Sequence, residues 1–331
     1  MRELPSSGRQ LDRLVGLLAG SAGEEWSQAE LARSMEMPPA ELSEVLARFQ
    51  AEGWPLEVGP DQRVRLPAAA DIPVASRVRP HLSTNHRLGR RYHHALRVDS
   101  TNDTARCLAE AGAAEGTVVV AEEQTGGRGR LGRTWLSRKG KDILLSLVLR
   151  PRVDPAQAPG LNLVMGLAAG QAIGEVAGIP TDLKWPNDVL IPGGKCCGVL
   201  TEMNADPGKI HFVIVGVGIN VNGTSLPDAI AGQASTLEQA AGGPVPRPRL
   251  VAALLNRLEA LYLVFLDQGL RPLLARWVAS SSSVRGRPVL VSNPGRSLRG
   301  TTAGLSEQGA LRIRREDGRV EEVLAGDVVR W

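Results

Sequence analysis

The segment from Glu123 to Trp135, EQTGGRGRLGRTW, restricts the possible folds of this chain more than any other. It follows an apolar strand pattern and alternates four glycines (Gly126, Gly127, Gly129, Gly132) with three arginines (Arg128, Arg130, Arg133). Three of the glycines match G-x-G-x-x-G, but a dinucleotide-binding unit needs a helix that opens at the third glycine. Here residues 135–141 are polar and Ile143 begins another strand pattern. The segment therefore predicts a loop between two strands and excludes a Rossmann unit. It also excludes a Walker loop, because no Gly-Lys-Ser/Thr follows.

Glycine and arginine in this alternation favour an anion-binding loop. Glycine gives the backbone freedom and allows a ligand to approach closely, whereas neighbouring arginines repel one another until an anion arrives. We therefore expect residues 123–135, called the glycine–arginine loop below, to be flexible when empty and to order over a phosphate. An exposed basic β-turn is the alternative that this segment alone leaves open.

Length and composition narrow the class of protein. A chain of 331 residues with 43% hydrophobic residues predicts two or three globular domains. The N-terminus is charged and lacks the apolar region of a secretory signal. The most apolar stretch, residues 161–179, contains Asn162, Gln171 and Glu175, and so predicts a buried helix and not a membrane span. Three cysteines, two of them adjacent (Cys196, Cys197), give neither a disulfide framework nor a CxxC metal pair, and we expect a reduced, soluble, cytoplasmic protein.

Residues 1–66 form the first predicted domain. Apolar residues at helical spacing predict helices over 10–18, around Leu31 and over 38–53, and Ser27 with Glu30 is a capping-box pattern for the second helix. Two short extended pieces around residues 59–61 then predict a hairpin. Three helices and a hairpin favour a winged helix-turn-helix, with a plain three-helix bundle as the alternative. Residues 67–87 contain prolines, polar residues and little periodicity, and predict a linker.

Residues 88–282 and 283–331 are the two remaining predicted domains. The first mixes strand and helix patterns, which predicts a mixed sheet flanked by helices. Its predicted strands are 117–122, 143–149, 181–185, 199–203 and 210–217, and its predicted helices are 101–112, 159–177 and 248–267. In the last domain, five short alternating runs between glycine and asparagine turns predict an SH3-like β-barrel. The predicted fold class is α+β.

A second group of polar residues lies at a predicted strand end, in residues 183–188, LKWPND. Pro186 turns the chain, so Asn187 and Asp188 present an amide and a carboxylate there, and a carboxylate beside phosphates usually binds Mg²⁺. Lys195 opens the next strand and can place a point charge on a carboxylate or phosphate oxygen. An ordinary Asn-Asp turn and an ordinary hairpin lysine are the alternatives. The chain has five lysines against 34 arginines, so a lysine beside a motif is more suggestive than usual.

Two further motifs place polar residues at strand ends. In residues 98–104, VDSTNDT, Ser100 lies at a predicted helix start and Asp103 completes a capping-box pattern with it. In residues 216–220, GVGIN, the glycines allow a flat ligand to approach and Asn220 can read the edge of a base. A plain N-cap and a glycine-rich turn are the respective alternatives.

In their order along the chain, STN, EQTGGRGRLGRTW, KWPND with GKCCG, and GVGIN resemble the motifs of the biotin protein ligase family. The resemblance covers the whole chain, including the N-terminal winged helix and C-terminal SH3-like domain of the bifunctional ligase–repressor subgroup. It implies a reaction with ATP and Mg²⁺ in which biotin becomes biotinyl-adenylate and is transferred to a lysine of a biotin carboxyl carrier protein. Cys196 and Cys197 stand where the family has an apolar and a small residue, and both are small and nonpolar enough to fit.

The resemblance also implies roles for individual residues. Biotin contacts are implied for Ser100, Thr101, Asn102, Gln124, Gly127, Arg128, Gly129, Arg130, Lys195 and Gly198. Contacts with ATP or the adenylate are implied for Arg130, Arg133, Trp135, Asn187, Asp188, Asn220 and Arg330, with Asp188 as the Mg²⁺ ligand. The residues assigned to catalysis are Lys195, Arg128 and Arg130, whose charges neutralise two anions that must approach each other.

Two other functions fit part of this pattern. A lipoate protein ligase uses the same adenylation chemistry and a related fold, although the glycine–arginine loop and the KWPND motif with its lysine favour biotin. A transcription regulator that only senses a ligand is the second, but intact Lys195, Arg128, Arg130 and Asp188 argue against a loss of catalysis. The residues leave open whether the chain forms a homodimer.

The predicted winged helix is a poor match to DNA. Residues 1–66 contain eleven acidic and seven basic side chains. The helix that begins at Pro38 has Glu41 in its first turn, and no Arg, Lys, Asn or Gln there to reach a base edge. The wing offers only Arg63 and Arg65, beside Asp61. Because most DNA affinity comes from neutralised phosphates, we expect weak DNA binding or none, despite the resemblance to repressors.

Overall fold

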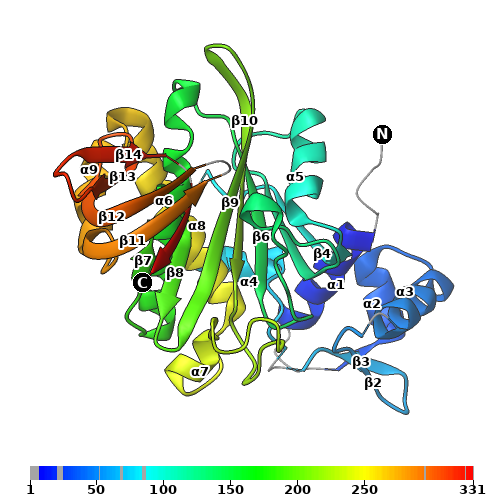
Figure 1. Ribbon diagram of the computed structural model, residues 1–331. Helices are drawn as coiled ribbons and strands as arrows, with labels where there is room; N and C mark the ends of the chain where they lie inside the picture. The colour runs from blue at the N-terminus through cyan, green and yellow to red at the C-terminus, as the bar shows by residue number, and fades with distance from the viewer. Residues whose placement is uncertain are drawn as a thin grey trace.

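The structure, a computed structural model, describes residues 7–20, 25–51, 53–67, 70–83, 87–293, 296–324 and 326–330. Three sheets follow one another along the chain, with three, seven and five strands. Figure 1 shows the N-terminal helices and sheet on one side of the large central sheet, and the C-terminal sheet on the other. Within the described ranges, no helix combines the length and the apolar character that crossing a membrane requires.

The N-terminal unit consists of three helices and a small antiparallel sheet. Its elements are α1 (Ser7–Gly20), β1 (Trp26–Ser27), α2 (Gln28–Met35), α3 (Pro39–Ala51), β2 (Glu57–Val58) and β3 (Arg63–Arg65), and the strand order is β1-β3-β2. The capping box predicted at Ser27 and Glu30 is present at the start of α2. One apolar stripe of each helix enters a shared core, which includes Leu14, Leu31 and Leu42. The predicted three helices and the hairpin are therefore confirmed.

Residues 70–83 contain more regular structure than the linker predicted from the sequence. The short helix α4 (Ala75–Val78) and the 3₁₀ turn η1 (Arg79–His81) lie within this stretch. Ile72 and Val74 are buried in the N-terminal core, whereas Val78 is buried in the central core. A four-residue helix is too short to show a hydrophobic period, which is why the sequence does not reveal it.

The central sheet is mixed and has the strand order β4-β5-β6-β10-β9-β8-β7. Only β4 and β5 pair in parallel among these strands. The strands are β4 (Tyr92–Val98), β5 (Val118–Gln124), β6 (Ile143–Leu149), β7 (Asp182–Lys184), β8 (Asp188–Ile191), β9 (Gly194–Asp206) and β10 (Lys209–Ile219). The helical segments are α5 (Thr101–Glu110), η2 (Arg130–Gly132), η3 (Pro155–Gln157), α6 (Gly160–Ala177), α7 (Leu237–Ala241), α8 (Arg247–Gln268) and α9 (Arg271–Ala279). The predicted strands and helices of this unit are confirmed, while β4, β8, α7 and α9 were not among the predicted ranges.

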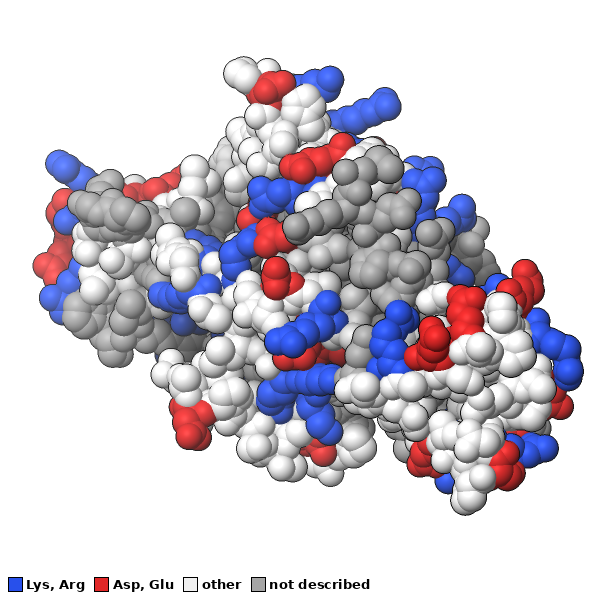
Figure 2. Space-filling view, turned by 90° about the vertical axis from the view of Figure 1, so that its right-hand side faces the viewer, with Lys and Arg blue, Asp and Glu red and all other residues white. Residues whose placement is uncertain are grey.

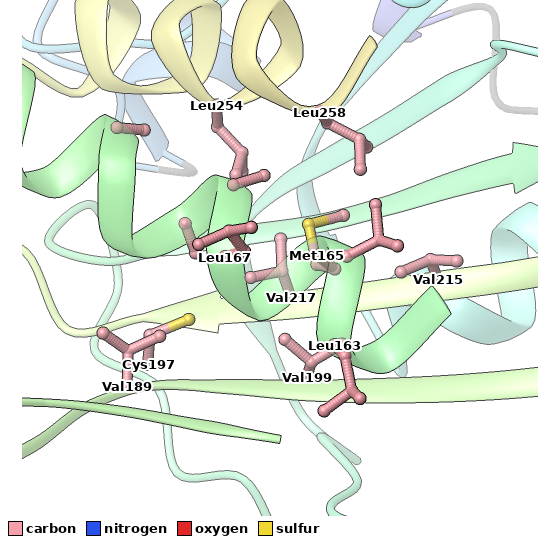
Figure 3. Close-up of a cluster of buried hydrophobic side chains, with 14 of the residues drawn as sticks. Leu163, Met165, Leu167, Val189, Cys197, Val199, Val215, Val217, Leu254 and Leu258 are labelled. Atoms are coloured by element: carbon pink, nitrogen blue, oxygen red, sulfur yellow. The ribbon is translucent and has the colours of Figure 1, made fainter. Parts of the chain in front are cut away.

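Helix α6 lies at the centre of the hydrophobic core, between the sheet and α8. Figure 3 shows its side chains between those of the sheet and those of α8; the labelled residues are Leu163, Met165, Leu167, Val189, Cys197, Val199, Val215, Val217, Leu254 and Leu258. A helix covered on two sides cannot be amphipathic, so its sequence is apolar on nearly every face. Because side chains alternate along a strand, the intervening residues of β9 and β10 face the other side of the sheet, where α5 packs against Phe212 and Ile214.

The C-terminal unit is a five-stranded antiparallel sheet with the order β14-β13-β12-β11-β15. The strands are β11 (Arg285–Asn293), β12 (Arg296–Leu305), β13 (Leu311–Arg314), β14 (Val320–Val323) and β15 (Asp327–Arg330), which confirms the five predicted runs and the α+β class. Trp185 Nε1 donates to the carbonyl oxygen of Gly309 at 3.0 Å. Val289 and Leu311 belong to the same buried cluster as α6, so the C-terminal sheet is packed on the central unit.

A buried polar network connects the residue 70–83 stretch to the central unit. Arg247, at the start of α8, is 2% exposed. Its guanidinium donates to Glu122 Oε2 at 2.8 Å, to Asp71 Oδ2 at 3.0 Å and to the carbonyl oxygens of Asp71 and Asp142. His94 Nε2 donates to Glu122 Oε1 at 2.9 Å. Burial by itself raises the pKa of Glu122, but the charge of Arg247 and the hydrogen bond from His94 outweigh burial and hold that pKa below its ordinary value.

Candidate active site

The four sequence motifs meet in one pocket, which encloses about 1030 Å³, part of it open to solvent. The predicted site residues that line it are Ser100, Thr101, Asn102, Gln124, Arg128, Gly129, Arg130, Arg133, Trp135, Asn187, Asp188, Lys195 and Gly198. The lining residues that were not predicted as site residues are Thr134, Lys184, Trp185, Pro186, Val199, Leu200, Gly216, Val217, Gly218 and Val328. Segments that are far apart in the sequence therefore form a single site.

One end of the pocket is formed by the start of α5 and the end of β5. Gln124 Oε1 accepts hydrogen bonds from the backbone N–H and the hydroxyl of Thr101, at 2.7 and 2.9 Å. Ser146 Oγ, on β6, lies 2.8 Å from Thr101 Oγ1 and 2.6 Å from Asn102 Oδ1. Thr101, Asn102 and Ser146 are buried, so these bonds fix the directions of polar groups that face the pocket.

The capping box predicted at Ser100 and Asp103 is not formed. Ser100 occupies the N-cap position of α5, but its side chain makes no capping hydrogen bond. The carboxylate of Asp103 instead accepts from both terminal nitrogens of Arg128, at 2.5 and 2.8 Å. A bidentate pair with a guanidinium is stronger than the contact with a backbone N–H that a capping box provides.

Hydrogen bonds within the glycine–arginine loop and from its Arg128 to acidic residues define the conformation that the structure shows, and its ordering over an anion stays a prediction. Gly129 N donates to Arg133 O at 2.7 Å, and Trp135 N donates to Gly127 O at 2.9 Å. Arg128 Nη2 lies 3.3 Å from both carboxylate oxygens of Glu202, on β9. The hydrogen bond to Asp103, assisted by the charge of Glu202, raises the pKa of Arg128. The carboxylates of the protein itself thus act as the anions for this arginine.

The route of the chain after the loop agrees with the rejection of a dinucleotide-binding unit. The only helical turn at the third glycine is η2, which has three residues, and β6 follows at Ile143. A helix long enough to direct its dipole at a pyrophosphate is therefore not present between Gly132 and Ile143.

Three glycines of β9 and β10 allow pocket side chains to lie directly on the sheet. A Cβ atom on Gly216 would lie 2.1 Å from Asn102 Oδ1, and one on Gly218 would lie 2.3 Å from the Trp135 ring. A Cβ atom on Gly198 would lie 2.9 Å from the same ring. Any larger residue at these positions displaces Asn102 or Trp135, so the glycines set the shape of the pocket.

Two cationic side chains contact the Asn187–Asp188 pair. Lys195 Nζ lies 2.6 Å from Asp188 Oδ1 and 5.6 Å from the centroid of the Trp135 ring. Arg130 Nη1 donates to Asn187 Oδ1 at 3.2 Å. The lining side chains include five basic ones (Arg128, Arg130, Arg133, Lys184, Lys195) but only the carboxylate of Asp188, within the described residues. This excess of positive charge suits a ligand that carries negative charge.

The C-terminal sheet completes one wall of the pocket. Val328 of β15 lines it, and Arg130 Nη2 donates to the carbonyl oxygen of Gly326 at 3.5 Å. Arg330 ends β15, and its predicted contact with ATP concerns a side chain that lies outside the described residues.

Two predicted site residues lie behind the pocket lining. Asn220 is 2% exposed, and its Nδ2 donates to the carbonyl oxygen of Lys195 at 3.5 Å. Asn220 therefore supports the start of β9 and does not present its amide to the pocket. A Cβ atom on Gly127 would lie 2.5 Å from the carbonyl oxygen of Trp135, so this glycine allows the two arms of the loop to approach each other.

Glu202 and Ser146 contact the site but were not predicted from the sequence. Gly198, Leu200 and Glu202 share one face of β9, because side chains alternate along a strand. The sequence could have indicated Glu202, because it is an acidic residue four positions after Gly198 and therefore lies on the same, pocket-facing side of the strand. Ser146 is the one polar residue of an otherwise apolar strand, which was the signal there.

The adjacent cysteines belong to the core and not to the chemistry of the pocket. Burial raises the pKa of the Cys196 thiol to about 12 and also raises that of Cys197 well above its ordinary value. A thiol with such a pKa is not a nucleophile at neutral pH. In the described part of the chain, no group of three or more His, Cys, Asp or Glu side chains could hold a metal ion by itself.

Two family models match the chain. Residues 95–220 match the Biotin/lipoate A/B protein ligase family, and residues 285–331 match the Biotin protein ligase C terminal domain. The Bifunctional ligase/repressor BirA of Bacillus subtilis is 37% identical over 239 residues, which are 72% of this chain and 72% of that protein. The same-named protein of Escherichia coli is 28% identical over 317 residues, 96% of this chain and 95% of that protein. The Biotin--[acetyl-CoA-carboxylase] ligase of Mycobacterium tuberculosis is 38% identical over 236 residues, 70% of this chain and 85% of that protein.

A solved structure has a similar fold. The biotin protein ligase from Aquifex aeolicus, in complex with biotin and ATP, superposes with a TM-score of 0.65 and 32% sequence identity. The superposition covers 73% of this chain and 100% of that chain.

Proposed function

Because this chain belongs to the biotin protein ligase family, we propose that it attaches biotin to a lysine of a biotin carboxyl carrier protein. It is an ATP-dependent ligase that first forms biotinyl-5′-AMP and pyrophosphate from biotin and ATP. It then transfers the biotinyl group to the carrier and releases AMP. The convergence of the four motifs in one pocket lined by an excess of cations is the observation that carries this proposal.

Biotin is favoured over lipoate as the substrate. One matching family model includes ligases for both, but the second is particular to biotin protein ligases, and the relatives above are biotin ligases. The pocket also retains Lys195, Arg128, Arg130 and Asp188, which argues against a protein that senses its ligand without ligation.

The end of the pocket around Ser100, Thr101, Asn102 and Gln124 binds biotin. Biotin carries a ureido group, with one carbonyl acceptor and two N–H donors in fixed directions. The Thr101–Gln124 bonds and the Ser146–Asn102 contact hold hydroxyl and amide groups in fixed directions of their own. Polar groups that are oriented before a ligand arrives lose little freedom when it binds, which favours affinity. Gly127, Gly129 and Gly198 leave room for the loop and the Trp135 ring beside the ligand.

The other end of the pocket binds ATP and carries out the first step. The carboxylate of biotin attacks the α-phosphate, so two anions must approach each other. Lys195, Arg130 and Arg133 line this region and reduce the repulsion between them, and the reduction is greatest as charge develops on the reacting oxygens. Trp135 packs against the nucleotide, and Arg330 is proposed as a further contact with ATP. Because no enzyme nucleophile is needed, the buried cysteines have no part in the reaction.

The donor set at Asp188 fits a Mg²⁺ ion that arrives with ATP. Magnesium in nucleotide sites is held by one or two carboxylates, with phosphate oxygens and waters as its other ligands. Asp188 supplies one carboxylate, and Asn187 beside it is held by Arg130 and by the carbonyl oxygen of Val199. When bound, the ion adds positive charge to the phosphates.

We expect the full chain to transfer labelled biotin to a carrier domain in the presence of ATP and Mg²⁺. Lipoate lacks the ureido group and leaves the polar groups of the biotin end unpaired, so its transfer should be at least about a hundredfold slower. The measurement is radiolabel in the carrier, with a carrier whose acceptor lysine is changed to arginine as the control. Equal transfer of lipoate and biotin would reject the assignment.

Residues 1–66 are proposed to be a winged helix-turn-helix, residues 88–282 the catalytic domain and residues 283–331 an SH3-like domain, with 67–87 between the first two. The order of helices and strands in the N-terminal unit and the short antiparallel strands of the C-terminal unit support these assignments.

We expect this winged helix to bind DNA weakly or not at all. Glu41 and Glu44 are exposed on α3, the helix that would enter the major groove. Both wing arginines are paired with acids, Arg63 with Asp61 at 3.5 Å and Arg65 with Glu57 at 2.5 Å. Figure 2 shows acidic side chains among the basic ones on the face that includes the N-terminal unit. Few arginines therefore remain for neutralising phosphates.

The measurement is a gel shift at low salt, with biotin and ATP present, on DNA from upstream of the host's biotin genes. The variant with Glu41→Lys and Glu44→Lys is the matched comparison, because it should gain non-specific affinity if charge is what limits binding. Saturable, sequence-specific binding of the unchanged protein at nanomolar concentration would restore the repressor role.

A further inference from the structure

Glu202 joins three segments of the pocket. Its carboxylate accepts from Asn102 Nδ2 at 2.7 Å, pairs with Arg106 Nη2 at 2.7 Å and lies 3.3 Å from Arg128 Nη2. Asn102 and Arg106 belong to α5, Arg128 to the glycine–arginine loop and Glu202 to β9. The Glu202 side chain is 25% exposed, so water screens these contacts only in part.

The orientation of the Asn102 amide depends on Glu202. Asn102 Oδ1 lies 2.6 Å from the hydroxyl of Ser146, which leaves the amide nitrogen facing Glu202. The second acceptor of that nitrogen is the carbonyl oxygen of Leu200, at the longer distance of 3.5 Å. Loss of the carboxylate thus removes the shorter bond of a side chain that lines the biotin end of the pocket.

The position of the loop depends on Glu202 and Asp103 together. Asp103 binds Arg128 through two hydrogen bonds, and Glu202 adds a second negative charge beside the same guanidinium. Two carboxylates therefore hold Arg128, and with it this part of the loop, in place.

We propose that Glu202 is a positioning residue, which orients Asn102 for biotin and, with Asp103, keeps the glycine–arginine loop closed over the adenylate. Arg128 then acts through the position of the loop, and not as a direct ligand of the phosphate. This inference rests on the proposed function. Retention of the adenylate follows from it, because a closed loop keeps the reactive anhydride from water and from other proteins.

Glu202→Gln tests the inference, because glutamine keeps the size and one acceptor oxygen but loses the charge. We expect the KM for biotin in pyrophosphate exchange to rise about tenfold with kcat changed less than about threefold. We also expect biotin label on a bystander protein, serum albumin, to rise about tenfold relative to the carrier, and trypsin to cleave faster within 125–135 when biotin and ATP are present. Glu175→Gln is the control: it removes a carboxylate of α6, outside the pocket lining, that pairs with Arg257 at 2.8 Å.

Asp103→Asn separates the two parts of the proposal. It weakens the hold on Arg128 but leaves the bond between Glu202 and Asn102, so bystander labelling should rise while the KM for biotin stays unchanged. Melting temperatures identify any variant that fails to fold. If Glu202→Gln does not fold, Asp103→Asn still tests whether the carboxylates that bind Arg128 keep the loop closed.

The proposal is overturned if Glu202→Gln behaves like Glu175→Gln in KM, bystander labelling and cleavage, or if kcat falls while KM is unchanged. If the unchanged protein itself shows no biotin-dependent pyrophosphate exchange, the proposed function fails instead, so the two failures can be told apart.

Discussion

Lys195→Ala should lower biotin-dependent pyrophosphate exchange by about 10²–10³-fold, as expected for loss of a well-placed charge at a reacting oxygen. Lys195 Nζ lies between Asp188 and the Trp135 ring, in the region where the carboxylate of biotin and the α-phosphate must meet. The charge is most needed in the transition state, so kcat should fall more than KM changes. The side chain is 34% exposed, so its removal should leave the fold intact.

Lys209→Ala is the matched control, because Lys209 is exposed at the start of β10, outside the pocket lining. It should retain the activity of the unchanged protein. Exchange by Lys195→Ala within about threefold of the unchanged protein would remove Lys195 from the mechanism, and an equal loss in both variants would mean that general charge, and not this position, matters.

Arg247→Met should lower the free energy of unfolding by about 3–5 kcal/mol, the largest stability effect that we expect from one substitution. Arg247 is almost fully buried and is the cation for Glu122 and Asp71. Methionine fills much of the space but leaves Glu122, which is 5% exposed, without its positive partner. A buried charge without a partner costs far more than the pair itself gains, so the variant should unfold at lower urea concentration.

This variant should also reverse the pH dependence that Glu122 contributes. In the unchanged protein the pKa of Glu122 is lower than that of an ordinary carboxyl group. Ionised Glu122 therefore stabilises the folded protein above the ordinary carboxyl pKa, and this stabilisation is lost as pH falls through the lowered pKa. Without Arg247, burial dominates and the pKa of Glu122 lies above its ordinary value. Its contribution to stability is then present at low pH and lost as pH rises through the raised pKa. The stability difference between variant and unchanged protein should therefore shrink from about pH 8 to about pH 5.

Arg257→Met is the control on the same helix, because Arg257 pairs with Glu175 where both side chains are about half exposed. Its effect should be below about 1 kcal/mol. Adding Glu122→Gln to Arg247→Met should recover part of the lost stability. A difference of less than 1 kcal/mol between Arg247→Met and Arg257→Met would contradict the role given to the buried network.

The elements with strong periodicity could be predicted from the sequence. Helices α6 and α8 extend over long apolar stretches. Strands β5 and β6 lie on either side of a loop whose composition excludes a helix. The type and bounds of these four elements therefore follow from the local sequence. The pocket lining also follows from motifs, since 13 of the predicted residues line it. Each of these depends on residues that are neighbours in the chain.

The contacts that could not be predicted depend on residues distant in the chain. The local sequence around Asp103 fits a capping box, in which its carboxylate would accept from a backbone N–H. The guanidinium of Arg128, 25 residues away, binds this carboxylate more strongly. The loop was expected to be flexible because glycines free its backbone and its arginines repel one another, but the carboxylates that bind Arg128 come from α5 and β9. Asn220 lies at a strand end like the other site residues, but a hydrogen bond to the backbone at Lys195 turns its amide away from the pocket.

The wall formed by Gly326 and Val328 has a consequence for the order in which the protein is made. The ribosome completes Ser100, the glycine–arginine loop and Lys195 long before these last residues of β15. Arg130 therefore has no Gly326 to bind, and the pocket no Val328, while the chain is still being synthesised. Reactive acyl-adenylate is thus not held in a complete site on nascent chains, and a premature stop codon after Lys195 and before Gly326 removes this wall even though Arg128, Arg130 and Lys195 have been translated.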